Sequence, residues 1–248
     1  MTTQSGNGAD PTIVRPVSEW FSNLLAQHMA PLEVLSGRIA AATRRSGDGP
    51  LGLSLDDAEA LVDLIDTALR ESRLAIGHGF IAAPDVVDGR DRYMLWLQRD
   101  AGVVKRLRLN FDTTDLDAYD YVNMDWYTKP IGQRTSALTG PYLDYAGADR
   151  LVVTVTAPIF VDDAVVGVVA TDLIASELEA QIARQLRTID AEVLVVNEDR
   201  AVIATNSPRW MPGERLRAHP HQDPDNFAAV VPLESWTGWS LAVAVPIR

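Results

Sequence analysis

Apolar residues at helical spacing dominate the first part of the chain. From Trp20 to Ile39 they recur three or four positions apart, a pattern typical of an amphipathic helix. After a glycine-rich break a second run repeats the pattern, and Ser54 stands where a side-chain cap would begin that helix. These patterns predict a helical N-terminal section over residues 17–73. Residues 1–16, which are polar and contain Gly, Thr and Pro, are predicted to be a disordered lead-in.

After residue 74 the pattern changes to alternating apolar and polar positions, which predicts β-strands. The segments "RYMLWLQR" and "VVKRLRLNF" alternate in this way, and "RLVVTVTAPIFVDDAVVGVVATDLI" contains two denser apolar strands around a polar turn. A helix and two shorter hairpins follow. This order predicts an α+β fold in which N-terminal helices precede two antiparallel-sheet modules in series, the second one reduced. The modules are expected at residues 74–189 and 190–248.

The composition is that of a globular protein with an excess of acidic side chains. The chain has 248 residues, of which 47% are hydrophobic, and 22 basic against 34 acidic side chains give a net charge of −12. This charge opposes binding to nucleic acid phosphates or to anionic membranes. Cysteine is absent, which excludes disulfides and thiolate metal sites. Without a signal-peptide pattern or an apolar run of membrane-spanning length, the sequence predicts a cytoplasmic protein with no membrane partner.

An aromatic segment between the predicted strands carries the candidate chemistry. In "YVNMDWYTKPIGQRTSALTGPYLDYAG", aromatic rings stand beside carboxylates and no strand or helix period is evident. These side chains are Tyr121, Asp125, Trp126, Tyr127, Tyr142 and Asp144. Aromatic faces attract cations, and carboxylates add charge-assisted hydrogen bonds. The segment is therefore the first place to look for a binding site.

The aromatic segment and the strands after it resemble a family of sensors. "YVNMDWYTKP", "GPYLDYAG" and "VVTVTAPIFVDDAVVGVVATDLIASELEAQI" are similar to the ligand-binding core of double Cache domains of the dCache_1 type, which are PAS-like modules. The resemblance extends over residues 76–246. It implies that residues 74–189 form the membrane-distal type of ligand-binding module and that residues 190–248 form a smaller PAS-like module.

The resemblance is nearest to the branch that binds amino acids and amines. A Trp-Tyr pair, a later Tyr and a still later Asp line the pocket in that branch, and Trp126, Tyr127, Tyr142 and Asp172 match this pattern. The branch also carries an Arg two positions before the Trp, which holds the α-carboxylate of the ligand, whereas this sequence has Met124 there. Methionine has no donor that replaces a guanidinium. The departure favours a ligand without an α-carboxylate.

Together these features predict a non-catalytic sensor for a small cationic metabolite, an amine or a quaternary ammonium compound. In the family, the strand that contains Trp96 faces the pocket, so this side chain is expected as a further wall. The predicted ligand-binding residues are Trp96, Tyr121, Asp125, Trp126, Tyr127, Tyr142, Asp144 and Asp172. No cofactor, catalytic residue or metal ligand is predicted, since His219 and His221 have no third ligand at a recognisable spacing.

Three other functions stay open from the sequence. The first is an amino-acid-binding Cache sensor. The second is an enzyme that uses Asp125, Asp144 and Asp172 as acid, base or metal ligands, although no nucleophile motif or phosphate loop accompanies them. The third is a structural interaction module in which the aromatic segment is core.

The expected partners follow from the helices and from the resemblance. Long N-terminal helices pair in the double Cache family, so the helical section is the expected contact of a homodimer. Because the sequence contains no membrane helix, a separate regulatory protein is expected to receive the signal.

Overall fold

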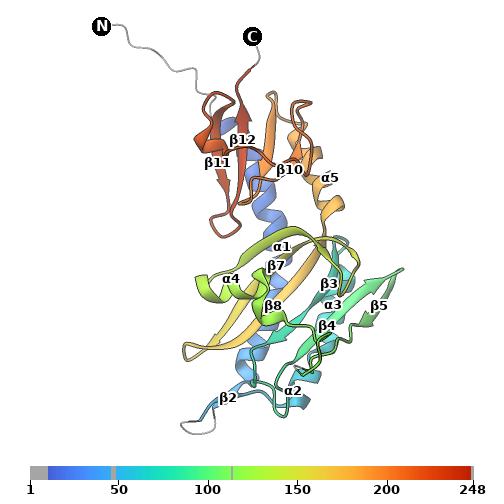
Figure 1. Cartoon of the computed structure of the whole chain (residues 1–248). Coiled ribbons are helices and arrows are strands. Elements are labelled where there is room, and N and C mark those ends of the chain that lie inside the picture. The colour runs from blue at the N-terminus through green and yellow to red at the C-terminus, as the bar shows by residue number, and fades with distance from the viewer. Residues whose placement is uncertain (1–10, 46–48, 113, 247–248) are drawn as a thin grey trace. The chain divides into compact units, whose positions relative to one another are not determined.

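The computed structural model describes residues 11–45, 49–112 and 114–246. It confirms an α+β chain in which N-terminal helices precede two antiparallel sheets (Figure 1). The chain divides into two compact units, one from Ala26 to Ala175 and the other combining the residues up to Leu25 with those from Ser176 onward. Each unit contains one of the two sheets.

The helices account for most of the N-terminal section and connect the sheets. They are α1 (Arg15–Ala42), α2 (Leu55–Glu59), α3 (Val62–Glu71), α4 (Asp125–Gln133) and α5 (Ala175–Leu186), with 3₁₀ turns η1 (Pro11–Val14), η2 (Tyr121–Asn123) and η3 (Pro220–Gln222). Within the described ranges, no helix has the length and apolar character needed to cross a membrane.

The strands fall into a large sheet, a small sheet and one two-residue pair. They are β1 (Arg44–Arg45), β2 (Leu51–Gly52), β3 (Ala75–Ala82), β4 (Met94–Asp100), β5 (Val103–Arg106), β6 (Ala137–Asp144), β7 (Arg150–Val161), β8 (Ala164–Ile174), β9 (Val193–Val196), β10 (Val202–Thr205), β11 (Phe227–Leu233) and β12 (Trp239–Ala244). The second sheet is the smaller of the two main sheets, as the sequence predicts.

The N-terminal helices form where the apolar spacing places them. The hydroxyl oxygen of Ser54 accepts a hydrogen bond from the backbone amide of Asp57 at 3.0 Å and caps α2. Residues 11–16, expected to be disordered, instead form η1 and the first residues of α1, and Val14 is fully buried. Residues 1–10 lie outside the described residues.

The smaller unit contains a four-stranded antiparallel sheet in the order β10-β9-β12-β11. Phe21 from the start of α1 stacks on Trp239 of β12, with ring centroids 5.8 Å apart. Both side chains are almost fully buried. Since α5 also belongs to this unit, the division of the chain falls before α5 and not at residues 189–190, where the sequence pattern places it.

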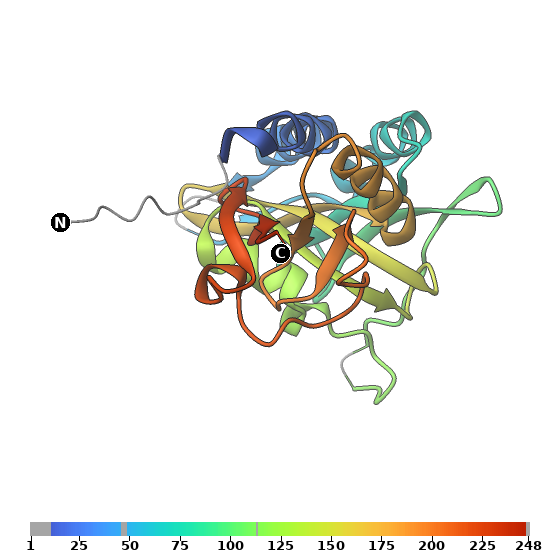
Figure 2. The ribbon, with the colours of Figure 1, turned by 90° about the horizontal axis from the view of Figure 1, so that it is seen from above.

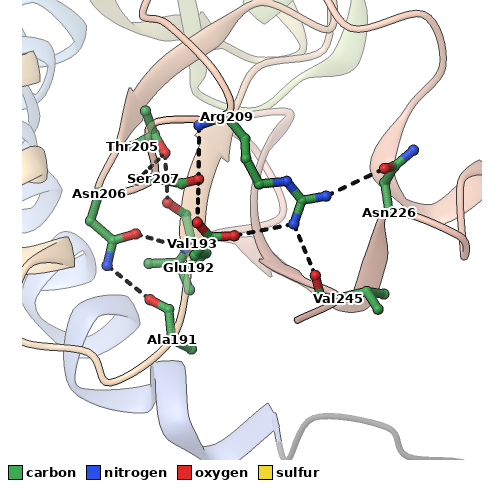
Figure 3. Close-up of polar contacts among 9 residues, drawn as sticks. All are labelled: Ala191, Glu192, Val193, Thr205, Asn206, Ser207, Arg209, Asn226 and Val245. Atoms are coloured by element: carbon green, nitrogen blue, oxygen red, sulfur yellow. Dashed lines mark hydrogen bonds and ion pairs between the residues drawn. The ribbon is translucent and has the colours of Figure 1, made fainter. Parts of the chain in front are cut away.

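A polar cluster in the smaller unit fixes the segment between β10 and β11. The guanidinium of Arg209 donates to the Glu192 carboxylate at 3.1 Å and to the carbonyl oxygen of Val245 at 2.9 Å (Figure 3). The hydroxyl of Ser207 donates to the other oxygen of Glu192 at 3.0 Å. The same guanidinium lies 4.4 Å from the ring centroid of Trp210. This segment, which has no clear period in the sequence, is thus held by specific side-chain bonds.

The larger unit is built on a six-stranded antiparallel sheet in the order β5-β4-β3-β8-β7-β6. The part of α1 that belongs to this unit and α3 lie on one side of the sheet, and α4 lies on the other side (Figure 2). Side chains alternate between the faces of a strand, so His78 and Phe80 of β3 point to one side and Gly77, Gly79 and Ile81 to the other. Ile81 packs in the same apolar cluster as the aromatic residues of α4. The face with Ile81 is therefore the α4 face.

Two histidines are buried on the opposite face. His28 of α1 and His78 of β3 are each less than a tenth exposed. Burial lowers the pKa of both imidazoles to about 4, and the proximity of His28 contributes to the lowered pKa of His78. Both rings are therefore neutral at neutral pH and act as part of the packing.

Two elements in the aromatic segment were not predicted from the sequence. The helix α4 has only nine residues and contains Pro130, which obscures its period. In β6 the pairing register shifts between Thr139 and Tyr142, around Gly140 and Pro141. Such a shift breaks the alternation by which strands are recognised.

Arg99 of β4 joins the end of α3 to the sheet. Its guanidinium donates to the carbonyl oxygens of Ser72 at 2.9 Å and Ala75 at 3.2 Å, and also to that of Leu69. Carbonyl groups at a helix C-terminus have no partner within the helix, so one charged group satisfies three acceptors at this connection.

Substitution of Arg99 by Met should lower the free energy of unfolding by about 2 kcal/mol, because it keeps much of the apolar stem but leaves these carbonyls without their charged donor. Urea unfolding of the ligand-free protein measures this. The matched control is Arg70→Met, which removes an exposed pair with Asp66 on α3 and should change the free energy of unfolding much less, because an exposed ion pair contributes little. Equal losses in the two variants would contradict the role given to Arg99.

Candidate functional site

A cavity lies in the larger unit on the α4 face of the sheet. Its walls come from β3, β4, β6, β7, β8 and α4, and from the segments that follow β5 and β6. The cavity volume open to the centre of a water molecule is about 30 Å³, and all empty space including the mouth is about 380 Å³. A ligand that fits without movement of the walls is therefore small.

A hydrogen-bonded chain of three side chains crosses the polar part of this cavity. Thr154 of β7 pairs directly with Asp172 of β8 in the sheet register, which brings the two side chains together on one face. The hydroxyl of Thr154 donates to Oδ1 of Asp172 at 2.6 Å, and the hydroxyl of Tyr142 lies 2.7 Å from that of Thr154. Because Thr154 uses its only hydrogen on the carboxylate, Tyr142 is the donor in the second bond.

Asp172 is a carboxyl group almost without solvent contact. It is 6% exposed, and burial raises its pKa to about 7, while the bond from Thr154 acts in the opposite direction and the Asp144 charge raises it slightly further. Burial disfavours the charged form of a carboxyl group. A positive charge placed beside Asp172 would favour its ionised form.

Asp144, the last residue of β6, supplies a second carboxylate to the cavity lining. Its Oδ1 accepts a hydrogen bond from the amide of Gly147 at 3.1 Å, and its Oδ2 accepts one from the amide of Ala148 at 2.6 Å. These bonds fix the side chain at the cavity wall. A carboxylate has further lone pairs, so both oxygens keep capacity to accept from a ligand.

The indole of Trp96 lies flat across β3 because two glycines leave room for it. A Cβ atom at Gly77 would come within 2.6 Å of the indole of Trp96, and one at Gly79 within 2.1 Å of the carbonyl oxygen of Leu95. Gly77 also pairs with Asp172 in the neighbouring strand. The absence of a side chain at Gly77 thus allows an aromatic face to form a wall close to the buried carboxylate.

Five of the eight residues predicted to bind ligand line the cavity. These are Trp96, Trp126, Tyr142, Asp144 and Asp172. They come from three strands and one helix, so the fold collects them from distant parts of the sequence.

The structure places the other three predicted residues outside the cavity lining. Tyr121 is fully buried and its hydroxyl donates to the carbonyl oxygen of Ala82 at 2.8 Å. Tyr127 packs edge-on against Tyr121 and Trp126, with centroid distances of 5.3 and 6.1 Å. Asp125 has a side chain that is 70% exposed and lies 3.5 Å from Lys129. The two tyrosines therefore support Trp126 from behind, and Asp125 is a surface residue of α4.

Two expectations about charge are corrected by these positions. Met124 is 39% exposed and is not part of the cavity lining, so its identity does not report directly on the charge of the cavity. Asp125 does not converge with Asp144 and Asp172, which removes one member of the carboxylate set proposed for an enzyme.

Several wall residues were missed from the sequence. Thr154 is the most important of them. Its cross-strand pairing with Asp172 was the signal that could have identified it. Tyr119, Leu107 and Leu109 lie in irregular segments next to strands, where periodicity gives no orientation. Burial and the charges of Asp144 and Asp172 raise the pKa of Tyr119 well above its ordinary value, so its hydroxyl stays protonated and able to donate.

The electrostatic character of the cavity is acidic. Among the residues that the structure describes, its lining includes Asp144 and Asp172 and no Lys, Arg or His. Burial and the charge of Asp172 likewise raise the pKa of Tyr142 far above its ordinary value. In the part of the chain that the structure describes, no group of three or more His, Asp or Glu side chains is arranged to hold a metal ion. His219 and His221 stack on each other at 5.5 Å between ring centroids.

Comparison with known families agrees with this architecture. Residues 61–180 match the family model described as the first PDC sensor domain of methyl-accepting chemotaxis protein-like proteins. This span contains β3 to β8 and α4, the elements that build the cavity. Residues 61–180 are therefore similar to a family of ligand-sensing domains. A search among curated proteins gives no match.

Solved sensor domains share the fold over nearly the whole chain. The sensory domain of the Campylobacter jejuni chemoreceptor Tlp3 with isoleucine bound is 12% identical with a TM-score of 0.62, covering 94% of this chain and 89% of that one. The Tlp3 domain in complex with L-valine is 10% identical with a TM-score of 0.62, covering 94% and 90%. A structure named methyl-accepting chemotaxis protein X is 15% identical with a TM-score of 0.63, covering 95% and 96%. At such identities the likeness shows a common fold.

The raised pKa of Asp172 predicts how the stability of the ligand-free protein depends on pH. An unfolded Asp titrates near about 3.9, so between about pH 4 and the folded pKa of about 7 the native state binds more protons than the unfolded state. Stability therefore falls as pH rises through this window. Asp172→Asn cannot ionise, and it should be more stable than wild type at pH 8 by on the order of 2 kcal/mol.

Thermal unfolding between about pH 5 and pH 8 measures this difference. Asp125→Asn is the matched control, because that carboxylate is exposed, and its curve should follow that of wild type. A constant difference between Asp172→Asn and wild type at every pH would show that Asp172 ionises in the folded protein as it does in the unfolded chain.

Proposed function

We propose that this protein is a non-catalytic sensor for a small cationic metabolite, an amine or a quaternary ammonium compound. The ligand binds in the cavity of the Cache-type domain. Trp96, Trp126 and Tyr142 form the aromatic walls, and Asp144 and Asp172 provide the negative charge.

The single observation that carries this proposal is the buried Asp172 in a cavity whose lining includes no basic residue. An uncompensated buried carboxylate destabilises a fold. A cation between Asp172 and the indoles removes that penalty, gains the charge-assisted contact and adds cation–π attraction of roughly 0.5–2 kcal/mol per aromatic face.

The second candidate is an amino-acid sensor. It is favoured by the likeness to the Tlp3 domain, which is described with isoleucine and with L-valine bound. Against it, the α-carboxylate of an amino acid would have no guanidinium or ammonium partner in the lining and would stand near two carboxylates. The hydroxyls of Tyr119 and Tyr142 are neutral donors and offer weaker compensation.

The proposed output is the coupling of ligand binding to a signalling or regulatory partner, as the sensor-domain family of residues 61–180 implies. A homodimer through the N-terminal helices and a cytoplasmic location stay predictions of the sequence. Ligand closure of the cavity would change the packing of α4 against β6, β7 and β8, which are its main contacts in the sheet.

The affinity for a quaternary ammonium ion should depend on pH through Asp172. Such a ligand does not titrate, and it competes with the proton for the carboxylate. With a folded pKa of about 7, affinity should be nearly constant above pH 8 and should fall about tenfold on going from pH 8 to pH 6. Isothermal titration calorimetry with tetramethylammonium and choline measures this.

Two variants make the pH experiment specific. Asp172→Asn should lose the pH dependence together with most of the affinity, because a neutral amide gives no charge to the ligand. Asp125→Asn should behave as wild type, since its exposed carboxylate lies outside the cavity. If wild type binds equally at pH 6 and pH 8, Asp172 is not the counter-ion of the ligand.

The choice between an amine and an amino acid can be tested with L-valine and isobutylamine, which differ only in the α-carboxylate. Isobutylamine should bind at least about tenfold more tightly, a difference of about 1.4 kcal/mol, because the carboxylate of valine lacks a cationic partner and approaches Asp144 and Asp172. Calorimetry of both ligands under the same conditions gives the ratio. The opposite order would establish the amino-acid sensor instead.

A further inference from the structure

A second cavity in the larger unit has the opposite charge. Its lining includes Arg90 and Arg92 from the loop before β4, and Arg106 and Arg108 at and after the end of β5. We call it the arginine cleft. Four guanidinium groups in one cleft are unexpected in a chain with a net charge of −12, because the acidic excess would allow each to be neutralised.

One of the four arginines is already neutralised. Arg106 donates through Nη2 to the Glu59 carboxylate at 2.8 Å and also through Nη1, in a two-point contact. The hydroxyl of Tyr93 donates to the same carboxylate at 3.0 Å. The Arg106 guanidinium and Tyr93 both hold the pKa of Glu59 below its ordinary value, although burial opposes them. Glu59 is the acidic member of the lining, and its ion pair is with Arg106, while the charge of Arg90 also contributes to its lowered pKa.

The other three arginines have no such partner. In the ranges that the structure describes, Arg90, Arg92 and Arg108 take part in no ion pair, and the described hydrogen bond of Arg92 goes to the carbonyl oxygen of its neighbour Asp91 at 3.0 Å. Clefts lined by one sign of charge focus the electrostatic field and concentrate ions of the other sign. Three unpaired guanidinium groups therefore make the cleft a place for anions.

The shape of the arginine cleft suits a small molecule. Its volume open to the centre of a water molecule is about 370 Å³, many times that of the ligand cavity. Leu107, Leu109 and Phe111 add apolar surface to its lining. The guanidinium fork matches the planar carboxylate and the tetrahedral phosphoryl group with two parallel hydrogen bonds.

We propose that the arginine cleft binds a small oxyanion with at least two negative charges, a dicarboxylate or a phosphoryl compound. Arg90, Arg92 and Arg108 contact the anion, and the Arg106–Glu59 pair holds the wall of the cleft in place. The charge of this site is opposite in sign to that of the cation cavity. The two share apolar residues such as Met94 and Leu107, but no charged residue lines both.

Calorimetric titration of the full chain with succinate and with inorganic phosphate, at low ionic strength, tests the proposal. At least one of them should bind saturably with a dissociation constant below about 1 mM, and the identity of that anion tells a carboxylate source from a phosphoryl source. The double variant Arg92→Gln/Arg108→Gln should weaken this binding at least tenfold.

Three controls accompany this titration. Arg184→Gln/Arg187→Gln removes the same charge from α5 and the residues directly after it and should leave anion affinity unchanged. Asp172→Asn should also leave it unchanged, so that failure of the cation sensor and failure of this proposal are distinguishable. Unchanged melting temperatures show that the cleft variants fold. Absence of binding by both anions, or equal weakening in the two double-arginine variants, would overturn the proposal.

Discussion

The burial of Asp172 is the constraint on which the rest of the site depends. A carboxylate in an apolar sheet face is expensive unless it is hydrogen-bonded and paired. Here Thr154 supplies one bond at 2.6 Å from the neighbouring strand, and Tyr142 completes the chain of donors. The second half of the requirement, a positive charge, is absent from the lining. Every wall of the cavity is arranged around a carboxyl group that is only half compensated by the protein itself.

The antiparallel sheet makes this arrangement possible because it brings distant residues into register. Gly77, Asp172 and Thr154 occupy paired positions on three adjacent strands, and the bare position at Gly77 leaves space for the indole of Trp96. On the reverse face, His78 is neutral and packed, so the same strand is polar without being charged on that side. A shift of one residue in the register of β3 or β8 would turn the side chains of the shifted strand to the face covered by α1 and α3.

The parts of the fold and the site that could be predicted from the sequence are those in elements with a regular pattern of apolar and polar residues. The helices and most strands carry clear periods, and the α+β order with a reduced second sheet is confirmed. Trp126, Tyr142 and Asp172, which the motif singles out, line the cavity, and their contact with a ligand stays a prediction. Asp125 lies outside the lining, because Asp125 and Trp126 are neighbours in sequence but point in different directions on a helix. Thr154 was missed because a threonine in a strand has no signal of its own until its cross-strand partner is known.

The unpaired charges of the larger unit do not contribute to its stability. For stability alone, an amide at position 172 would serve better than a carboxyl group, because the amide keeps the bond from Thr154 and carries no ionisation cost. Likewise, three arginines without ion pairs gain nothing for the fold by facing one cleft. Asp172 is a buried charge, whereas Arg92 is half-buried and Arg90 and Arg108 are exposed, and in both features the missing partner has a definite sign. The proposed cation in the acidic cavity and the proposed anion in the basic cleft would each supply the counter-ion that the lining of its site does not provide.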